Sequence, residues 1–196
     1  LSGLHSLRSS SAAVATSIAE WAERAPIKLA HREGNMLQRS SPAVYELAAS
    51  IPGLSGVEVQ TNRSNLWDRD TVLAYKKEAN RWGMRTCSMG GSLPAGESIT
   101  DPGPAEKSLR KTIRSGEILG ASVVLVGGFF ATCPKMDDES SYGPTVELLK
   151  RLGPVAEDAG MTLGLGLSLG VADYQKLLGL VAHPAVRAYW DASGTD

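Results

Sequence analysis

Cysteine and histidine are scarce in this sequence. Among 196 residues there are two cysteines, Cys87 and Cys133, and three histidines. The cysteines are not spaced as a Cys-x-x-Cys pair, and two are too few for a disulfide-stapled scaffold. We therefore expect neither a zinc ribbon nor a disulfide framework, and we interpret the two cysteines as a buried thiol and a loop thiol.

The sequence also lacks an excess of charge of either sign and lacks long apolar runs. Twenty Lys and Arg residues stand against 21 Asp and Glu residues, so no net field attracts nucleic acid, and we expect no nucleic-acid partner. No apolar run approaches the ~20 residues of a membrane helix, so we expect no membrane association. The 42% hydrophobic residues are enough for one sizeable core.

Residues 1–26 are rich in Ser and Ala and contain the weak apolar stretch AAVATSIA. Two interpretations stay open. The segment is the remnant of an export signal, or it is an amphipathic helix whose apolar face includes Ile18, Trp21 and Ala22. We expect a cytoplasmic protein, with export to the periplasm as the alternative if the segment is a signal remnant.

From Ile27 onward, short apolar segments alternate with stretches of helical periodicity, which is the pattern of parallel βαβ units. Ser41 and Pro42 are expected to start the first helix, and Gly83 to end the second. Strands are predicted at 27–33, 56–62, 84–91, 121–130, 161–169 and 186–191, with helices at 40–51, 69–83, 106–120, 145–160 and 171–183.

Such an alternation fits a (β/α) barrel or an open doubly wound sheet, both of which bind ligands at the carboxyl ends of the strands. In the second strand Glu58, Gln60 and Asn62 share one face, while Val57 and Val59 share the other. A sheet covered by helices on both faces is apolar on both, whereas a barrel accepts polar side chains in its lumen. The pattern therefore favours an α/β fold of the (β/α) barrel type.

Five segments, KLAHREGNM, GLSGVEVQ, GASVVLVGG, LGPVAEDAGMTLGLG and HPAVRAYWDASG, carry a resemblance to a known family. In their order they resemble the xylose isomerase-like TIM barrels, the sugar phosphate isomerase/epimerase superfamily. The resemblance covers residues 27–196 and implies a partial barrel with six of eight βα units. It also implies a divalent metal (Mn, Mg or Co), a small-molecule carbohydrate substrate and metal-assisted removal of a proton next to a carbonyl.

The resemblance assigns metal ligands to the ends of four strands, a Glu on the fifth, an Asp on the sixth, and a His and a Glu on the last two. Asp191 matches the sixth-strand ligand, but Gly166 stands where the fifth-strand Glu is expected. We therefore expect a chain that is truncated after its sixth strand, in which metal binding is doubtful and the family's catalysis is absent. The alternative is a non-catalytic sugar-binding or vestigial barrel protein.

Candidate site residues lie at the expected strand ends. Glu58 and His31 are the catalytic candidates, although Glu58 is mid-strand and a salt-linked rim is a common role for His31 and its neighbours. The expected substrate-binding residues are His31, Arg32, Gln60, Asn62 and Ser168, and the metal-binding residue is Asp191.

Two other segments have competing interpretations. Gly164 to Gly170 reads G-x-G-x-x-x-G, but its glycines lie inside a strand, which disfavours a dinucleotide site. The acids 137–139 are expected in a solvated loop, with a lid over the substrate as the alternative. His183, in a helix-to-strand turn, is expected to be structural.

Six strands that do not close a barrel leave the first and sixth with unpaired edges. We therefore expect the chain either to self-associate through these edges or to be marginally stable.

Overall fold

The computed structural model describes residues 28–37 and 39–191, so both interpretations of residues 1–26 lie outside it. Six strands alternate with helices along the chain. The elements are β1 (Leu29–Arg32), α2 (Glu33–Met36), α3 (Val44–Ala49), β2 (Leu54–Gln60), α4 (Arg69–Trp82), β3 (Arg85–Gly90), α5 (Pro102–Leu119), β4 (Val123–Gly128), the 3-10 turn η1 (Phe130–Thr132), α6 (Glu139–Asp158), β5 (Thr162–Leu167), α7 (Val171–Val181) and β6 (Val186–Ala188).

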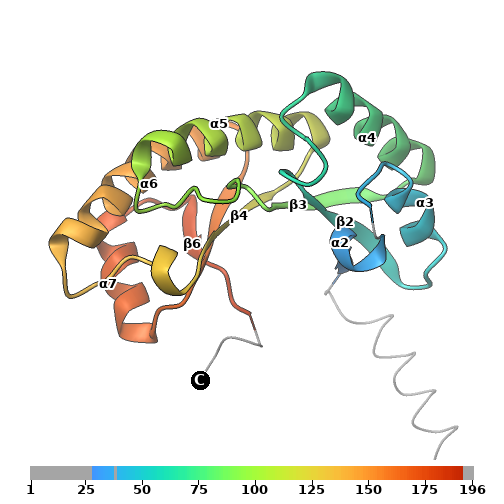
Figure 1. The fold of residues 1–196 in the computed structure, drawn as a ribbon. Helices are drawn as coiled ribbons and strands as arrows, with labels where there is room; N and C mark the ends of the chain where they lie inside the picture. Colours follow the sequence, from blue (N-terminus) through green and yellow to red (C-terminus); the bar gives the residue numbers. More distant parts are fainter. Residues whose placement is uncertain (1–27, 38, 192–196) are drawn as a thin grey trace, which may run out of the picture.

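The strands form one parallel sheet in the order β1-β2-β3-β4-β5-β6. Strand order does not reverse anywhere in this sheet, as it would in a doubly wound fold. Figure 1 shows the helices along the outside of the curved sheet, with the first unit in blue and the last in red at the two ends of the arc. The prediction of a (β/α) barrel type is confirmed. Within the described residues, no helix has the length and apolar character needed to cross a bilayer.

The two faces of the strands differ as the sequence predicts. Val57 and Val59 on β2, and Leu163 and Leu165 on β5, are fully buried between the sheet and the helices. This layer is the hydrophobic core, and its removal from water is the main stabilising contribution to the fold. Glu58 faces the other side, the lumen of the partial barrel.

Several helix boundaries differ from the prediction. Helix α3 begins at Val44 with Ala43 as its N-cap, and Ser41 and Pro42 form the preceding turn instead. Helix α4 ends at Gly83 as predicted, in the left-handed conformation that glycine adopts readily (φ 62°). Helices α5 and α6 each begin several residues earlier than predicted, at Pro102 and Glu139.

The early start of α6 places two of the acids 137–139 at the N-terminus of this helix. The carboxylate of Asp138 accepts a hydrogen bond from the backbone N–H of Ser140 and caps the helix. The side-chain hydrogen bond from Ser140 also lowers the pKa of Asp138. Glu139 lies in the first turn, where a negative charge is favourable. Asp137 and Asp138 thus lie in an exposed loop as predicted, and only Glu139 already belongs to the helix.

Three predicted site residues lie just beyond their strands. Strand β2 ends at Gln60, so Asn62 is in the following turn and does not continue the Glu58–Gln60 face of the strand. Likewise Ser168 follows β5 and Asp191 follows β6. His183 is structural as expected, since its Nδ1 accepts a hydrogen bond from the N–H of Ala185 (3.2 Å).

Glu33 is the most deeply buried charged residue near the end of β1, with 0% of its surface exposed. Its carboxylate accepts hydrogen bonds from Tyr75 Oη (2.6 Å), Ser64 Oγ (2.8 Å) and the backbone N–H of Gln60 (3.0 Å). Burial and the hydrogen bond to Glu33 raise the pKa of Tyr75, so the tyrosine remains a donor. One carboxylate thus joins α2, the loop after β2 and α4.

Replacing Glu33 with alanine should lower the free energy of unfolding by at least about 3 kcal/mol, because three buried donors lose their acceptor. Urea unfolding followed by circular dichroism measures this change. Glu46→Ala removes an exposed carboxylate from α3 and should cost less than about 0.5 kcal/mol. Equal effects of the two substitutions would show that the Glu33 network does not stabilise the fold.

Candidate functional site

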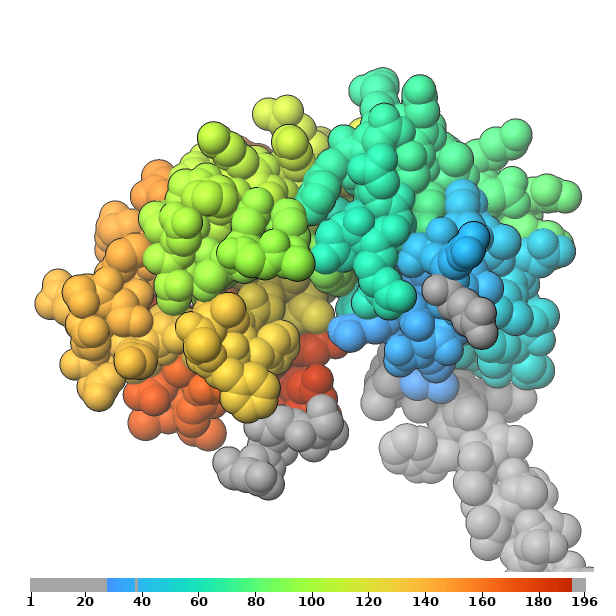
Figure 2. Space-filling view, viewed as in Figure 1, coloured from blue at the N-terminus to red at the C-terminus, as the bar shows by residue number. Residues whose placement is uncertain are grey.

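A cavity of about 1050 Å³ opens at the carboxyl ends of the strands. Its wall includes residues from or just after β1, β2, β4, β5 and β6, so the cavity lies inside the arc of elements whose outer surface Figure 2 shows. Four of the predicted site residues line it. They are Arg32, Gln60, Ser168 and Asp191. His31, Glu58 and Asn62 do not line it directly.

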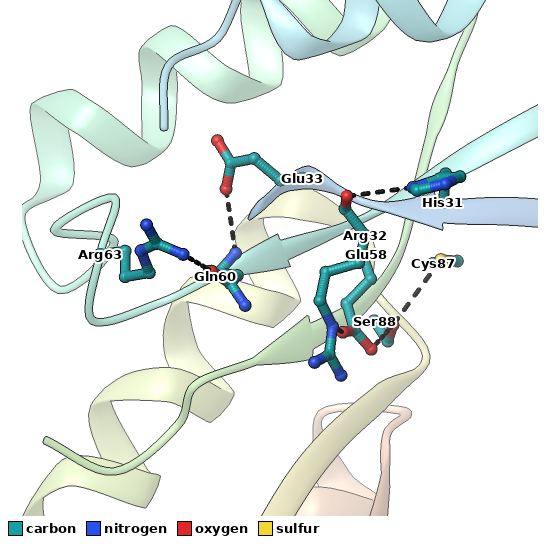
Figure 3. Close-up of polar contacts among 8 residues, drawn as sticks. All are labelled: His31, Arg32, Glu33, Glu58, Gln60, Arg63, Cys87 and Ser88. Atoms are coloured by element: carbon teal, nitrogen blue, oxygen red, sulfur yellow. Dashed lines mark hydrogen bonds and ion pairs between the residues drawn. The ribbon is translucent and has the colours of Figure 1, made fainter. Parts of the chain in front are cut away.

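Glu58 lies beneath the cavity and holds Arg32 in place. Arg32 Nε donates to Glu58 Oε1 (2.5 Å), and Ser88 Oγ donates to Glu58 Oε2 (2.9 Å), as Figure 3 shows. The register between β2 and β3 shifts by one residue, from Val57–Thr86 to Glu58–Ser88, which places Ser88 beside the carboxylate. Both oxygens of Glu58 are therefore engaged, and its role in this arrangement is to orient the Arg32 guanidinium.

Gln60 forms part of the polar wall next to Arg32. Its side-chain oxygen accepts a hydrogen bond from Arg63 Nη1 (3.2 Å), and its backbone N–H donates to Glu33. A Cβ atom at Gly34 would lie only 2.6 Å from Gln60 Oε1. Glycine at 34 thus makes room for the Gln60 amide at the cavity wall.

Asn62 and His31 lie outside the cavity wall. Asn62 Nδ2 donates to the carbonyl of Leu93 (3.3 Å), so the side chain supports a wall segment from behind. His31 is paired in register with Val57, whose side chain faces the helices, while Arg32 is paired with Glu58. Figure 3 shows the His31 ring apart from the group formed by Arg32, Glu58 and Ser88. The contact with substrate expected of His31 stays a prediction without geometric support.

The glycines of β5 make room for a tyrosine that follows β6. A Cβ at Gly164 would lie 3.4 Å from Tyr189 Cδ2, and one at Gly166 would lie 3.1 Å from Leu125 Cδ1 and 3.9 Å from Tyr189 Cδ1. Burial, together with the negative charge of Glu58, raises the pKa of Tyr189. Where the family resemblance places a carboxylate on β5, this chain therefore packs a tyrosine ring and a leucine side chain against bare backbone.

Tyr174 of α7 lines the cavity and fixes the end of β5. Its hydroxyl accepts from the N–H of Leu167 (2.7 Å) and donates to the carbonyl of Leu165 (2.9 Å). These bonds satisfy backbone groups where the strand ends. Ser168 follows directly, and its Oγ accepts a long hydrogen bond from the N–H of Phe130 (3.5 Å).

Sequence reasoning missed most of the aromatic wall. Phe129, Phe130, Tyr189 and Trp190 all line the cavity. They come directly after β4 and β6, so the same strand-end rule that selected Arg32 and Asp191 applies to them. The signal was the paired aromatics FF and YW at two predicted strand ends.

The described residues do not by themselves form a divalent-metal site. Nowhere in 28–37 or 39–191 do three or more His, Cys, Asp or Glu side chains converge as metal ligands. Glu58 is engaged by Arg32 and Ser88, and Gly166 provides no donor. A catalytic metal centre of this type needs at least three protein donors, so the residues present do not fit the ligand set that the family resemblance implies.

Neither a family model nor a curated protein matches the sequence. Solved structures do match. The xylose isomerase domain protein from Planctomyces limnophilus has a TM-score of 0.67 at 13% identity, covering 85% of this chain and 64% of its own. The 3-keto-D-glucoside 4-epimerase from E. coli has a TM-score of 0.69 at 12% identity, covering 83% and 67%. The D-allulose 3-epimerase from Methylomonas sp. has a TM-score of 0.65 at 20% identity, covering 82% and 61%.

This chain has the xylose isomerase-like TIM-barrel fold. The matches with these epimerases and isomerase-like proteins cover 81% to 85% of its residues, and the chain spans 61% to 67% of the length of those proteins. The six parallel units of the sheet follow one another as in such a barrel.

The negative charge of Glu58 affects the pKa of the Cys87 thiol. Burial, with a further contribution from the Glu58 carboxylate, raises the pKa of Cys87, and burial raises that of Cys133. Both thiols should therefore react with iodoacetamide at pH 8 more slowly than free cysteine, because less thiolate is present. Glu58→Gln removes the negative charge and should accelerate alkylation of Cys87 about twofold or more, without changing Cys133.

Peptide mass spectrometry after timed alkylation measures both rates in one sample. Glu46→Gln, on the outer helix α3, serves as the matched control and should change neither rate. Equal acceleration of both thiols in Glu58→Gln would indicate general loosening of the fold and would contradict the electrostatic explanation.

Proposed function

We propose that this chain is a carbohydrate-binding protein of the sugar isomerase/epimerase type, and that its cavity holds one sugar ring. The observation that carries the proposal is the cavity at the carboxyl ends of the strands, which combines polar side chains with aromatic ones. Arg32, Gln60, Glu97 and Asp191 offer donors and acceptors to hydroxyl groups. Aromatic rings such as Tyr189 offer flat apolar surface to the C–H face of a sugar.

The structural neighbours support this class of ligand. Among them are a 3-keto-D-glucoside 4-epimerase and a D-psicose 3-epimerase whose structure was determined in the presence of D-fructose. In the family, a divalent metal stabilises the enediolate that forms when a proton leaves the carbon next to a carbonyl. Substrate binding at the strand ends is a separate requirement, and the polar and aromatic residues that line the cavity support it without a complete ligand set.

We infer that the 196 residues bind a sugar without epimerising it. A proton-transfer residue must reach the substrate, and Glu58 is held below the cavity wall by Arg32 and Ser88. Asp191 lines the cavity, but Gly166 adds no second carboxylate on the neighbouring strand. The arrangement favours a binding site over a site for proton transfer.

Carbohydrate binding is tested by ligand-observed saturation-transfer NMR with D-fructose, D-psicose and methyl glycosides of common hexoses. At least one of these should bind in the millimolar range, with transfer lost or weakened in Gln60→Ala. Asn80→Ala, which truncates an exposed amide of the outer helix α4, should bind like the parent chain. The absence of transfer from every sugar, or transfer unaffected by Gln60→Ala, would refute a carbohydrate site in this cavity.

Metal affinity is tested by calorimetry with Mn²⁺, Mg²⁺ and Co²⁺. We expect no micromolar binding to the 196-residue chain, since losing even a residue that supports a metal ligand costs about 10- to 100-fold in affinity. Gly166→Glu adds one carboxylate beside the cavity and should not produce tight binding, nor should Gly179→Glu on the exposed side of α7. Micromolar affinity that disappears in Asp191→Ala would contradict this prediction and identify a site built around Asp191.

A further inference from the structure

The apolar wall of the cavity is unusually exposed for side chains of its size. Nine large apolar residues of the described chain are at least 37% exposed, and four of these line this one cavity. Phe129 and Phe130 follow β4, Val171 begins α7, and Trp190 follows β6, with exposed fractions of 55%, 89%, 77% and 75%. Exposed apolar patches of this kind mark places where an apolar ligand group binds.

Phe130 is held in this exposed position at a cost in backbone conformation. Its φ is 51°, a left-handed value that bulky residues rarely adopt. Thr132 fixes the turn, because its hydroxyl accepts from the N–H of Phe129 (2.9 Å) and donates to the carbonyl of the same residue (2.8 Å). Strained backbone that neighbouring hydrogen bonds maintain is frequent at ligand sites. The turn therefore presents the Phe130 ring to the cavity as a preformed surface.

The cavity lining also contains charged side chains, and their balance does not favour a phosphate group. Arg32 is the one cation among the described residues that line the cavity, and it is already paired with Glu58. Two carboxylates, Glu97 and Asp191, also line the cavity. Phosphate is normally bound by several unpaired donors or cations. Glu97, whose Oε2 is buried without a hydrogen-bond partner, and Asp191 add negative charge that disfavours an anion.

The cavity also offers more space than one sugar ring requires. Its volume of about 1050 Å³ lies at the upper end of the roughly 300–1,000 Å³ typical of sites for drug-sized ligands. Polar side chains from β1, β2 and the loop after β3 line the cavity together with the four exposed apolar side chains, which come from the segments after β4, β5 and β6. An occupant that matches both walls has a neutral, hydroxyl-rich part and a flat apolar part.

Resting on the carbohydrate site proposed above, we propose that the ligand is an uncharged aryl glycoside. Its sugar lies against Arg32, Gln60 and Glu97, and its aromatic aglycone stacks on the surface formed by Phe130 and Trp190. Free sugars and sugar phosphates lack the apolar part and leave this surface exposed to water.

Calorimetry with matched pairs of glycosides tests the proposal on the 196-residue chain. The probes are the methyl and para-nitrophenyl β-glycosides of D-glucose, D-galactose and D-xylose, with glucose 6-phosphate and para-nitrophenol as further ligands. For at least one sugar, the para-nitrophenyl glycoside should bind about tenfold or more tightly than its methyl counterpart, because the ring buries additional apolar surface. Glucose 6-phosphate should bind no more tightly than methyl glucoside.

Phe130→Ala and Trp190→Ala should each weaken binding of the para-nitrophenyl glycoside about 3- to 10-fold and change that of the methyl glycoside less than about twofold. Both side chains are mostly exposed, so thermal unfolding should be unchanged. Leu73→Ala, which removes a 44% exposed side chain from α4, is the matched control and should alter neither affinity.

The outcomes separate this proposal from the proposed function. Equal affinities for methyl and para-nitrophenyl glycosides would overturn the aryl glycoside and leave carbohydrate binding intact. Binding of para-nitrophenol alone as tightly as its glycoside would show an apolar site that does not recognise sugar. Failure of every glycoside to bind would overturn both.

Discussion

The buried carboxylate of Glu33 is the interaction on which the polar half of the site depends. It lies one residue after Arg32 and accepts hydrogen bonds from Tyr75, Ser64 and the backbone of Gln60. Burying an acid is costly unless each oxygen finds donors, and here the donors come from three separate parts of the chain. Glu33 therefore fixes the position of the cavity wall around Arg32 and Gln60, although Glu33 does not itself line the cavity.

The same network extends through the tyrosines of two helices. Tyr75 packs edge-on against Tyr45, with ring centroids 6.1 Å apart, and the Tyr45 hydroxyl bonds to Thr86 of β3 (2.6 Å). Burial raises the pKa of Tyr45, so its hydroxyl remains protonated. Two hydrogen bonds and one edge-on ring contact thus connect α2 to β3 through the helical layer. Polar networks that satisfy all their members give an apolar core a single arrangement.

Much of the fold was predictable because hydrophobic periodicity directly reflects burial. Leu163 and Leu165 alternate with Gly164 and Gly166 in the sequence. In the structure the two leucines lie on one face of β5 and the two glycines on the other. Helix starts were less predictable. A helix was predicted from residue 145, yet α6 begins at Glu139, because the Asp138 cap stabilises its first turn.

The site was predictable only where strand ends could be located. Arg32, Gln60, Ser168 and Asp191 reach the cavity wall because parallel strands place their carboxyl ends at one edge. Side-chain direction was harder to infer, since a shift of one residue moves a side chain to the other face, and His31 and Arg32 differ in this way. The burial of Glu33 depends on donors far away in the sequence, which no local pattern reveals.

The packing of Tyr189 against β5 also constrains how this sequence can change over time. Gly166 lies against Leu125 and near the Tyr189 ring, so a longer side chain at 166 competes with both for the same space. The effect of a substitution at position 166 therefore depends on the residues at positions 125 and 189. An acid at 166 is accommodated more easily after Tyr189 or Leu125 has become smaller, and a smaller residue at 189 leaves a void until 166 is filled. The gain of a carboxylate at position 166 consequently has a preferred order of substitutions.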